Sequence, residues 1–218
     1  MTSIKVLTNG RYKTVTASLV DPTVEVGKVG MYAEVVNLSV KNNKQHCVAV
    51  DVINGRMNLL LNTTSQFAAN VKEDDVLVAK HLSGGFDVSD VRDKRIVCLA
   101  GGSGIAGIIP IVRYVLKHTT SEIDVIYLES DENHNVSRDF WELSDSRARV
   151  HFAASQGVMS SNEHTPILGM LTKLTGCQPI VFMNKPVYFA CGPKGFVNRL
   201  KDALVPIYAE EKDFRLNF

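Results

Sequence analysis

The chain lacks several features that would narrow its function at once. No apolar run approaches the roughly 20 residues that a membrane-spanning helix needs, and Met1–Val6 does not begin the apolar segment of a signal peptide. Neither charge dominates, because 24 basic residues face 23 acidic ones and the net charge is +1. This balance gives no electrostatic reason to expect nucleic acid or a membrane as a partner. We therefore expect a soluble, cytoplasmic protein.

Cysteine is also scarce and scattered. The chain has four cysteines, and none lies within four residues of another: Cys47, Cys98, Cys177 and Cys191. This spacing excludes a local CxxC zinc or thioredoxin motif and the clustered ligands of an iron–sulfur domain. We expect reduced thiols and no metal site.

The sequence divides into two parts of different character. The first part holds short β-branched and apolar runs, among them Met31–Val36, Cys47–Ile53 and Arg56–Leu61. The dipeptide Asn54-Gly55 is typical of a hairpin turn. The second part alternates expected strands with expected helices, which is typical of a parallel sheet covered on both faces. We predict a small N-terminal antiparallel β-barrel, residues 1–91, followed by an α/β domain with a parallel sheet, residues 92–218.

The most informative segment of the second part is Ile96–Gly107, where an apolar run leads into a glycine cluster and then an amphipathic stretch. Gly102, Gly104 and Gly107 fit the dinucleotide fingerprint G-x-G-x-x-G, and Glu129 ends the next expected strand, where a ribose-binding acid is found. Glycine lets the backbone approach a phosphate, and a helix N-terminus presents N–H groups to it. The alternative is a glycine turn that only packs a helix on a strand.

A second turn of the same kind lies near the C-terminus. The apolar run Val187–Ala190 leads directly into Cys191-Gly192-Pro193. In an open α/β sheet, ligands bind outside the carboxyl ends of the strands. Two such turns in one sheet therefore predict the two sides of one cleft.

With both turns in view, the chain resembles the ferredoxin–NADP reductase-like family of flavin and NAD(P)H oxidoreductases. The resemblance rests on Ala100–Ile105, on Val187–Pro193 some 85 residues later, and on Leu82–Phe86, which is similar to the segment ending the family's flavin barrel. It implies a ferredoxin reductase-like fold in which the barrel binds flavin. It also implies that the nicotinamide nucleotide is held by Gly101, Gly102, Ser103, Gly104, Ile105, Glu129, Ser130, Cys191, Gly192 and Pro193.

The flavin half of the resemblance is degenerate. The family uses Arg-x-Tyr/Phe-Ser/Thr, and the best positional candidate here is the segment from Lys44 to Cys47. By resemblance, Lys44 meets the flavin phosphate as a point charge, His46 stacks on the ring, and Cys47 lies near its redox nitrogen. The alternative is that Lys44 and His46 are surface residues of a hairpin and Cys47 is a small core residue.

Two further positions follow from the resemblance. Thr64 and Ser65 are similar to a Gly-x-x-Ser/Thr segment that receives the flavin phosphate, although the glycine is missing. Phe218, or as the alternative Phe214, would cover the flavin ring, because the family often ends in an aromatic residue near it. The departures leave open a flavin that binds weakly, as a substrate, or a barrel that has lost it.

The reaction implied is hydride transfer from NADH or NADPH to FAD or FMN, with electrons passing to a diffusible acceptor or a partner protein. Cys47 and Cys191 are the candidate catalytic positions, since both would lie near the reacting atoms, although neither need be a nucleophile. The acidic loop that begins at Glu129 disfavours a 2′-phosphate and favours NADH, whereas Ser130 and Arg138 favour NADPH.

Two other classes of protein remain as alternatives. A reductase-like module that binds a nucleotide or a protein without redox activity would explain the degenerate flavin segment and Gly107, where the family often has proline. A Rossmann dehydrogenase would need a substrate domain after the nucleotide fold. Only a short tail follows the last expected helix, which counts against that class.

Overall fold

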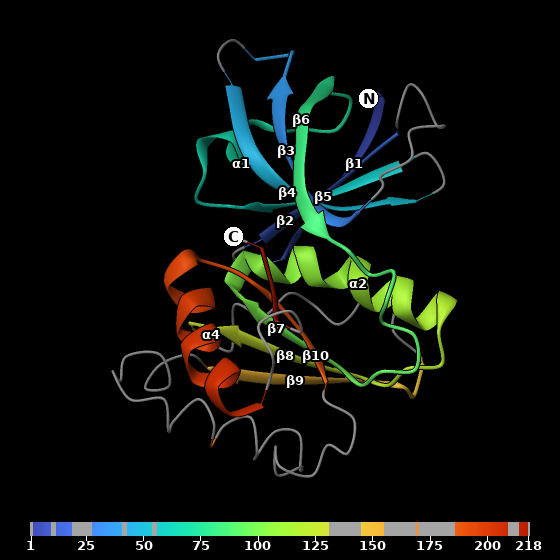
Figure 1. Ribbon diagram of the computed structural model, residues 1–218. Coiled ribbons are helices and arrows are strands. Elements are labelled where there is room, and N and C mark those ends of the chain that lie inside the picture. The colour runs from blue at the N-terminus through green and yellow to red at the C-terminus, as the bar shows by residue number, and fades with distance from the viewer. Residues whose placement is uncertain are drawn as a thin grey trace.

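The computed structural model describes residues 2–9, 12–18, 28–40, 43–53, 56–130, 145–154, 169, 186–208 and 214–217. Its strands form two sheets, one from each half of the chain, and the two stand one above the other (Figure 1). The predicted boundary at residues 91 and 92 falls in the connection between these sheets. That each half forms a separate domain stays a prediction.

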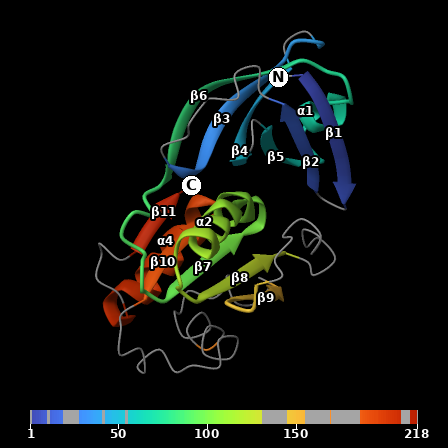
Figure 2. The same ribbon diagram turned by 90° about the vertical axis from the view of Figure 1, so that its right-hand side faces the viewer.

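The first sheet is antiparallel and has the order β1-β2-β5-β4-β3-β6. Its strands are β1 (Thr2–Asn9), β2 (Tyr12–Ser18), β3 (Val29–Asn37), β4 (Asn43–Ile53), β5 (Arg56–Asn62) and β6 (Leu77–Phe86). The sheet is rolled (Figure 2), so that alternate residues of β3 and β5, such as Val35 and Leu59, meet in one core. A short helix, α1 (Gln66–Asn70), adds Phe67 to this core. The predicted antiparallel first half is confirmed.

The second sheet is parallel and has the order β11-β10-β7-β8-β9. Its elements are β7 (Ile96–Gly101), the 3₁₀ turn η1 (Gly102–Gly104), α2 (Ile105–His118), β8 (Ile123–Glu129), β9 (Ala148–Ala154), β10 (Val187–Cys191), α4 (Lys194–Tyr208) and β11 (Phe214–Asn217). Every residue of β7, β8 and β10 is buried, as expected for strands covered on both faces. Helix α2 covers one face and α4 the other, which confirms the predicted α/β half.

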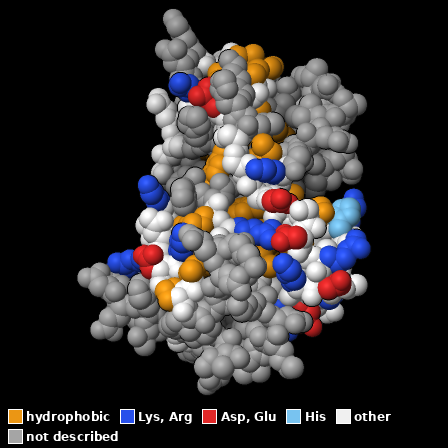
Figure 3. Space-filling view, in the orientation of Figure 1, with side chains coloured by type: hydrophobic (Ala, Val, Ile, Leu, Met, Phe, Trp, Pro, Cys, Tyr) orange, Lys and Arg blue, Asp and Glu red, His pale blue; other side chains and the backbone are white. Residues whose placement is uncertain are grey.

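A carboxylate is buried inside this parallel sheet. The side chain of Asp124 on β8 is fully buried and accepts hydrogen bonds from Arg95 Nη2 at 2.7 Å and Arg149 Nε at 2.8 Å. Burial opposes its ionisation, but the hydrogen bonds from Arg149 and Arg95 prevail and lower the pKa of this carboxyl. On the molecular face of Figure 3, described acidic and basic side chains are interspersed.

The two sheets touch directly through α2 and β10. Gly30 on β3 has φ +68°, and a Cβ at this position would lie 2.5 Å from the carbonyl oxygen of Gly107 on α2. At the end of β6, Phe86 packs edge-on against Phe189 of β10, with ring centroids 5.4 Å apart. These contacts hold the rolled sheet above the carboxyl ends of the parallel strands.

Candidate functional site

The two turns singled out in the sequence lie against each other. A Cβ on Gly104 would lie 2.1 Å from the carbonyl oxygen of Cys191 and 2.6 Å from the amide nitrogen of Gly192. The ring of Phe196 on α4 closes the same region, because a Cβ on either Gly101 or Gly192 would lie 2.9 Å from its Cδ1. Glycine at these positions therefore permits close contact between backbones and ring.

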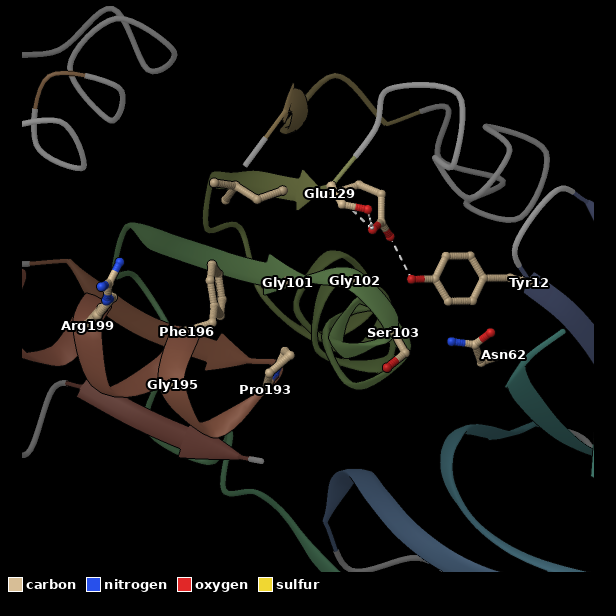
Figure 4. Close-up of a pocket in the computed structure, with 12 residues that line it drawn as sticks. Tyr12, Asn62, Gly101, Gly102, Ser103, Glu129, Pro193, Gly195, Phe196 and Arg199 are labelled. Carbon is tan, nitrogen blue, oxygen red and sulfur yellow. Dashed lines mark hydrogen bonds between the residues drawn. The ribbon is translucent and has the colours of Figure 1, made fainter. Parts of the chain in front are cut away.

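A cleft of about 610 Å³ opens beside these turns (Figure 4). In the parallel half, the lining residues come from the ends of β7 and β8, from η1 and from the N-terminal part of α4: Gly101, Gly102, Ser103, Leu128, Glu129, Ser130, Pro193, Gly195, Phe196 and Arg199. The rolled sheet adds Tyr12 from β2 and Asn62 from β5. The cleft lies at the carboxyl ends of β7 and β8, where open α/β sheets bind ligands.

The N-terminus of α2 faces this cleft through η1. Gly102 has φ +54°, a left-handed conformation that glycine adopts without strain. No described side chain caps the first turn of η1 or of α2, and the exposed Ser103 lies at the cleft wall. Free N–H groups and the positive end of a helix dipole are suited to a phosphate group.

Glu129 ends β8 beside this turn, and its carboxylate is already hydrogen-bonded by protein groups. Tyr12 Oη donates to Oε2 at 2.6 Å, and Tyr127 Oη donates to the same oxygen at 3.2 Å. The amide and hydroxyl of Ser130 donate to Oε1 at 2.9 and 3.1 Å. Burial, with the neighbouring Tyr12 and Glu129, raises the pKa of Tyr127 well above its usual value, so this hydroxyl stays a donor.

Cys191 is buried where the rolled sheet meets the end of β10. Its Sγ lies 3.8 Å from the hydroxyl of Tyr32 on β3 and accepts backbone hydrogen bonds from Gly107 and Gly192. Burial raises the pKa of the thiol to about 11, although these hydrogen bonds act in the opposite direction. The thiol is thus neutral near pH 7, which suits a role in shape rather than as a nucleophile.

The candidate flavin segment lies on β4. Lys44 is exposed and forms an ion pair of 3.8 Å with Glu34. In the register, Lys44 is opposite Val36 and His46 is opposite Glu34. Side chains alternate along a strand, so positions 44 and 46 share a sheet face with Tyr32, the residue that contacts Cys191.

The structure says less about the other residues predicted to contact flavin. Position 47 pairs with Ala33 on the other face, and the side chains of His46 and Cys47 lie outside the description. Thr64 and Ser65 form the turn before α1, where Ser65 Oγ accepts from the amide of Ala68 at 3.1 Å. Phe218 lies outside the described residues.

Six residues that line the cleft were not predicted as site residues from the sequence: Tyr12, Asn62, Leu128, Gly195, Phe196 and Arg199. Phe196 and Arg199 lie three positions apart on α4, so helical spacing after the Cys191 turn was a usable signal. Tyr12 and Asn62 come from the other sheet, and no local pattern marks them.

No known family model matches this sequence, and no curated protein matches it by sequence. Solved structures do match. The ferredoxin reductase of carbazole 1,9a-dioxygenase has a TM-score of 0.78 at 14% identity, covering 99% of this chain and 67% of its own. The Plasmodium falciparum ferredoxin-NADP⁺ reductase has a TM-score of 0.76 at 12% identity, covering 99% and 94%. The Amycolatopsis cytochrome P450 reductase GcoB has a TM-score of 0.75 at 12% identity, covering 99% and 68%.

These matches show that the chain has the ferredoxin reductase-like fold, and they confirm the resemblance seen in the sequence at the level of fold. Each neighbour extends over both sheets, because each covers nearly the whole of this chain. Among the helices of the described part, none has the length and apolar character needed to span a bilayer.

Proposed function

We propose that this chain is an NAD(P)H-dependent flavin oxidoreductase that passes electrons to a diffusible acceptor or a partner protein. The observation that carries the proposal is the contact between the Gly101–Gly104 and Cys191–Pro193 turns, with a cleft beside them that residues of the rolled sheet also line. Its structural neighbours are named as reductases of ferredoxin and cytochrome P450 systems, which supports this class of reaction.

On the nucleotide side, the support for the proposal is a helix N-terminus of the kind suited to an anion. The uncapped N-terminus of α2 and Ser103 would hold the diphosphate, and the left-handed Gly102 would let its backbone approach. Phe196 and Pro193 give the cleft an apolar wall for the rings of the dinucleotide. The neutral, buried thiol of Cys191 would shape the contact between β10 and the rolled sheet through Tyr32.

On the flavin side, the support for the proposal is Lys44, an exposed cation on the face of β3 and β4 that also carries Tyr32, the partner of Cys191. One of the neighbouring reductases was solved in an FAD apo form, which supports FAD, with FMN as the other candidate. When bound, flavin would supply the redox chemistry, as the acceptor of a hydride from the nicotinamide. His46, Cys47, Thr64, Ser65 and Phe218 stay predicted contacts.

We further propose NADH as the preferred donor. The carboxylate of Glu129 lines the cleft, and the protons of Tyr12 and Tyr127 are directed at it. A 2′-phosphate placed there would meet negative charge. Arg199 lines the same cleft from α4 and is the described cation that favours NADPH. Titration of the protein with NADH and with NADPH gives a dissociation constant for each, and the lower of the two identifies the preferred donor.

The first experiment is an absorption spectrum of the purified protein, followed by NADH oxidation with FAD or FMN and an artificial acceptor. We expect flavin bands or flavin-dependent oxidation. Gly102→Val should weaken NADH binding, because φ +54° strains a β-branched residue. Gly169→Val is the control, since a Cβ there contacts no atom of the described residues within 4 Å.

A colourless protein that oxidises neither NADH nor NADPH with added flavin contradicts the proposed enzyme. In that case the second candidate, a nucleotide-binding module without redox activity, is favoured. The observation on its side is the ion pair between Lys44 and Glu34, which places a carboxylate beside the one cation expected to meet a flavin phosphate.

A further inference from the structure

The rolled sheet contributes its own pair of side chains to the nucleotide cleft. Tyr12 on β2 and Asn62 on β5 are directly opposite each other in the antiparallel register, and both line the cleft. Figure 4 shows them facing the turn formed by Gly102 and Ser103. The cleft therefore has a wall from each half of the chain.

Tyr12 fixes the distance between these walls. Its hydroxyl donates across the two sheets to Glu129, 117 residues away, and both residues are only 3% exposed. A Cβ on Gly102 would lie 3.3 Å from the same hydroxyl. The neighbouring Asn62 is consequently held across the cleft from the turn that would bind phosphate.

The amide of Asn62 is oriented by Thr64. Asn62 Oδ1 accepts the backbone N–H of Thr64 at 3.0 Å and its hydroxyl at 2.8 Å. With the oxygen committed, Nδ2 is the end of the amide left to donate, and Figure 4 shows it on the side of Ser103. Among the described residues, no hydrogen-bond acceptor for Nδ2 is found.

We propose that Asn62 contacts a phosphate of the bound dinucleotide, so that the diphosphate lies between the two sheets. This inference rests on the proposed function, since it places the ligand at the α2 N-terminus. Each wall of the cleft would contribute different groups to the phosphate. Gly102 and Ser103 offer backbone and hydroxyl groups, and Asn62 offers a neutral N–H donor opposite them. A neutral N–H can donate a hydrogen bond to the phosphate without forming an ion pair with Glu129, which lines the same cleft.

The decisive variant is Asn62→Asp, which keeps the shape of the side chain. The new carboxylate still accepts both hydrogen bonds from Thr64, so the turn before α1 is retained. It loses the N–H donor and adds a negative charge. Titration calorimetry with NADH, ADP and adenosine then separates phosphate recognition from recognition of the adenine and ribose. We expect the Kd for NADH and ADP to rise about 10- to 100-fold, the size of a lost hydrogen bond to a charged group. The Kd for adenosine should be unchanged.

Asn58→Asp is the matched control. Asn58 lies on the same strand, does not line the cleft, and its Oδ1 accepts a hydrogen bond from Thr16 Oγ1 at 2.7 Å, which aspartate preserves. It adds the same charge to β5 and should leave the Kd for NADH unchanged. Thr64→Val removes one of the two bonds that orient Asn62, so it should raise the Kd for ADP by less than Asn62→Asp does.

The outcomes are distinguishable. If the wild type binds NADH and Asn62→Asp binds ADP equally well, the Asn62 contact is refuted and the proposed function stands. If adenosine and ADP weaken together, the substitution has changed the fold of the cleft and the phosphate contact is again rejected. A wild type that binds neither NADH, NADPH nor ADP refutes the proposed function itself. Should Asn62→Asp melt early, Thr64→Val tests the same contact, and an unchanged Kd for ADP would overturn it.

Discussion

Gly104→Ala offers a test of the contact between the two turns that does not depend on any ligand. Gly104 has φ −60° and ψ −18°, a conformation that alanine adopts readily. Judged by backbone conformation alone, the substitution would stabilise the protein by about 0.5–1 kcal/mol. Any loss of stability must therefore come from what the added methyl group meets.

The three atoms nearest to that methyl group would all belong to the main chain. It would lie 2.1 Å from the carbonyl oxygen of Cys191, 2.4 Å from its carbonyl carbon and 2.6 Å from the nitrogen of Gly192, where real contacts essentially never fall below 3.0 Å. The end of β10 must therefore move by about 1 Å, at a cost we put at the upper end of overpacking, about 3 kcal/mol. For a chain of this length the melting temperature should fall by about 6–12 °C.

Thermal unfolding followed by circular dichroism measures this change. Gly195→Ala is the control: it also lies at the start of a helix, and a Cβ there meets no atom of the described part of the chain within 4 Å. Its melting temperature should stay the same or rise. If Gly104→Ala melts at or above the wild-type temperature, the two turns are not in contact and the cleft is wrongly assembled.

Three further predictions concern stability and thiol chemistry. Tyr12→Phe removes a buried hydrogen bond to a carboxylate and should lower the free energy of unfolding, measured by urea titration, by about 2 kcal/mol. Tyr114→Phe on α2 is the control and should leave the free energy of unfolding unchanged. Equal effects of the two substitutions would argue against the contact between the sheets. Cys191 should resist iodoacetamide in the native protein at about pH 8 and react after denaturation, since its pKa is about 11; mass spectrometry that finds rapid native labelling would contradict its burial. Asp124 has a lowered pKa, so its ionised form stabilises the fold above the unfolded value of about 4 and this contribution is lost as the pH falls further. The stability difference between wild type and Asp124→Asn should accordingly shrink below about pH 4, and a difference that grows there would contradict the lowered pKa.

The sequence predicts the fold well where the signal is local. The strands Ile96–Gly101 and Val187–Cys191 are continuous apolar runs because both faces are buried, and each is followed by glycine. Three elements escaped prediction: Thr2–Asn9, Gln66–Asn70 and Phe214–Asn217. The last has four residues and is held by parallel pairing with β10 and by an Arg215 ion pair of 2.6 Å to Asp90, 125 residues away. No window of sequence contains that information.

The site residues, too, could be predicted from the sequence only where the signal is local. Glycine turns are readable because the close backbone approach at Gly104 demands a specific residue type. Tyr12 and Asn62 are ordinary strand residues in their own context, and they acquire a role only through the packing of one sheet on the other. Glu129 was correctly placed at a strand end, but its position alone does not reveal that four protein groups already donate to it.

The position of β7 has a consequence for how the protein is made. This strand lies at the centre of the parallel sheet, between β8, which follows it closely, and β10, which is synthesised much later. During translation the β7 edge stays open until Val187–Cys191 leaves the ribosome, and an unpaired apolar edge favours aggregation. Pairing across so long a chain is also slow. Slower synthesis at low temperature should therefore improve the yield of folded protein, and a chain truncated before Val187 should precipitate rather than yield a smaller stable unit.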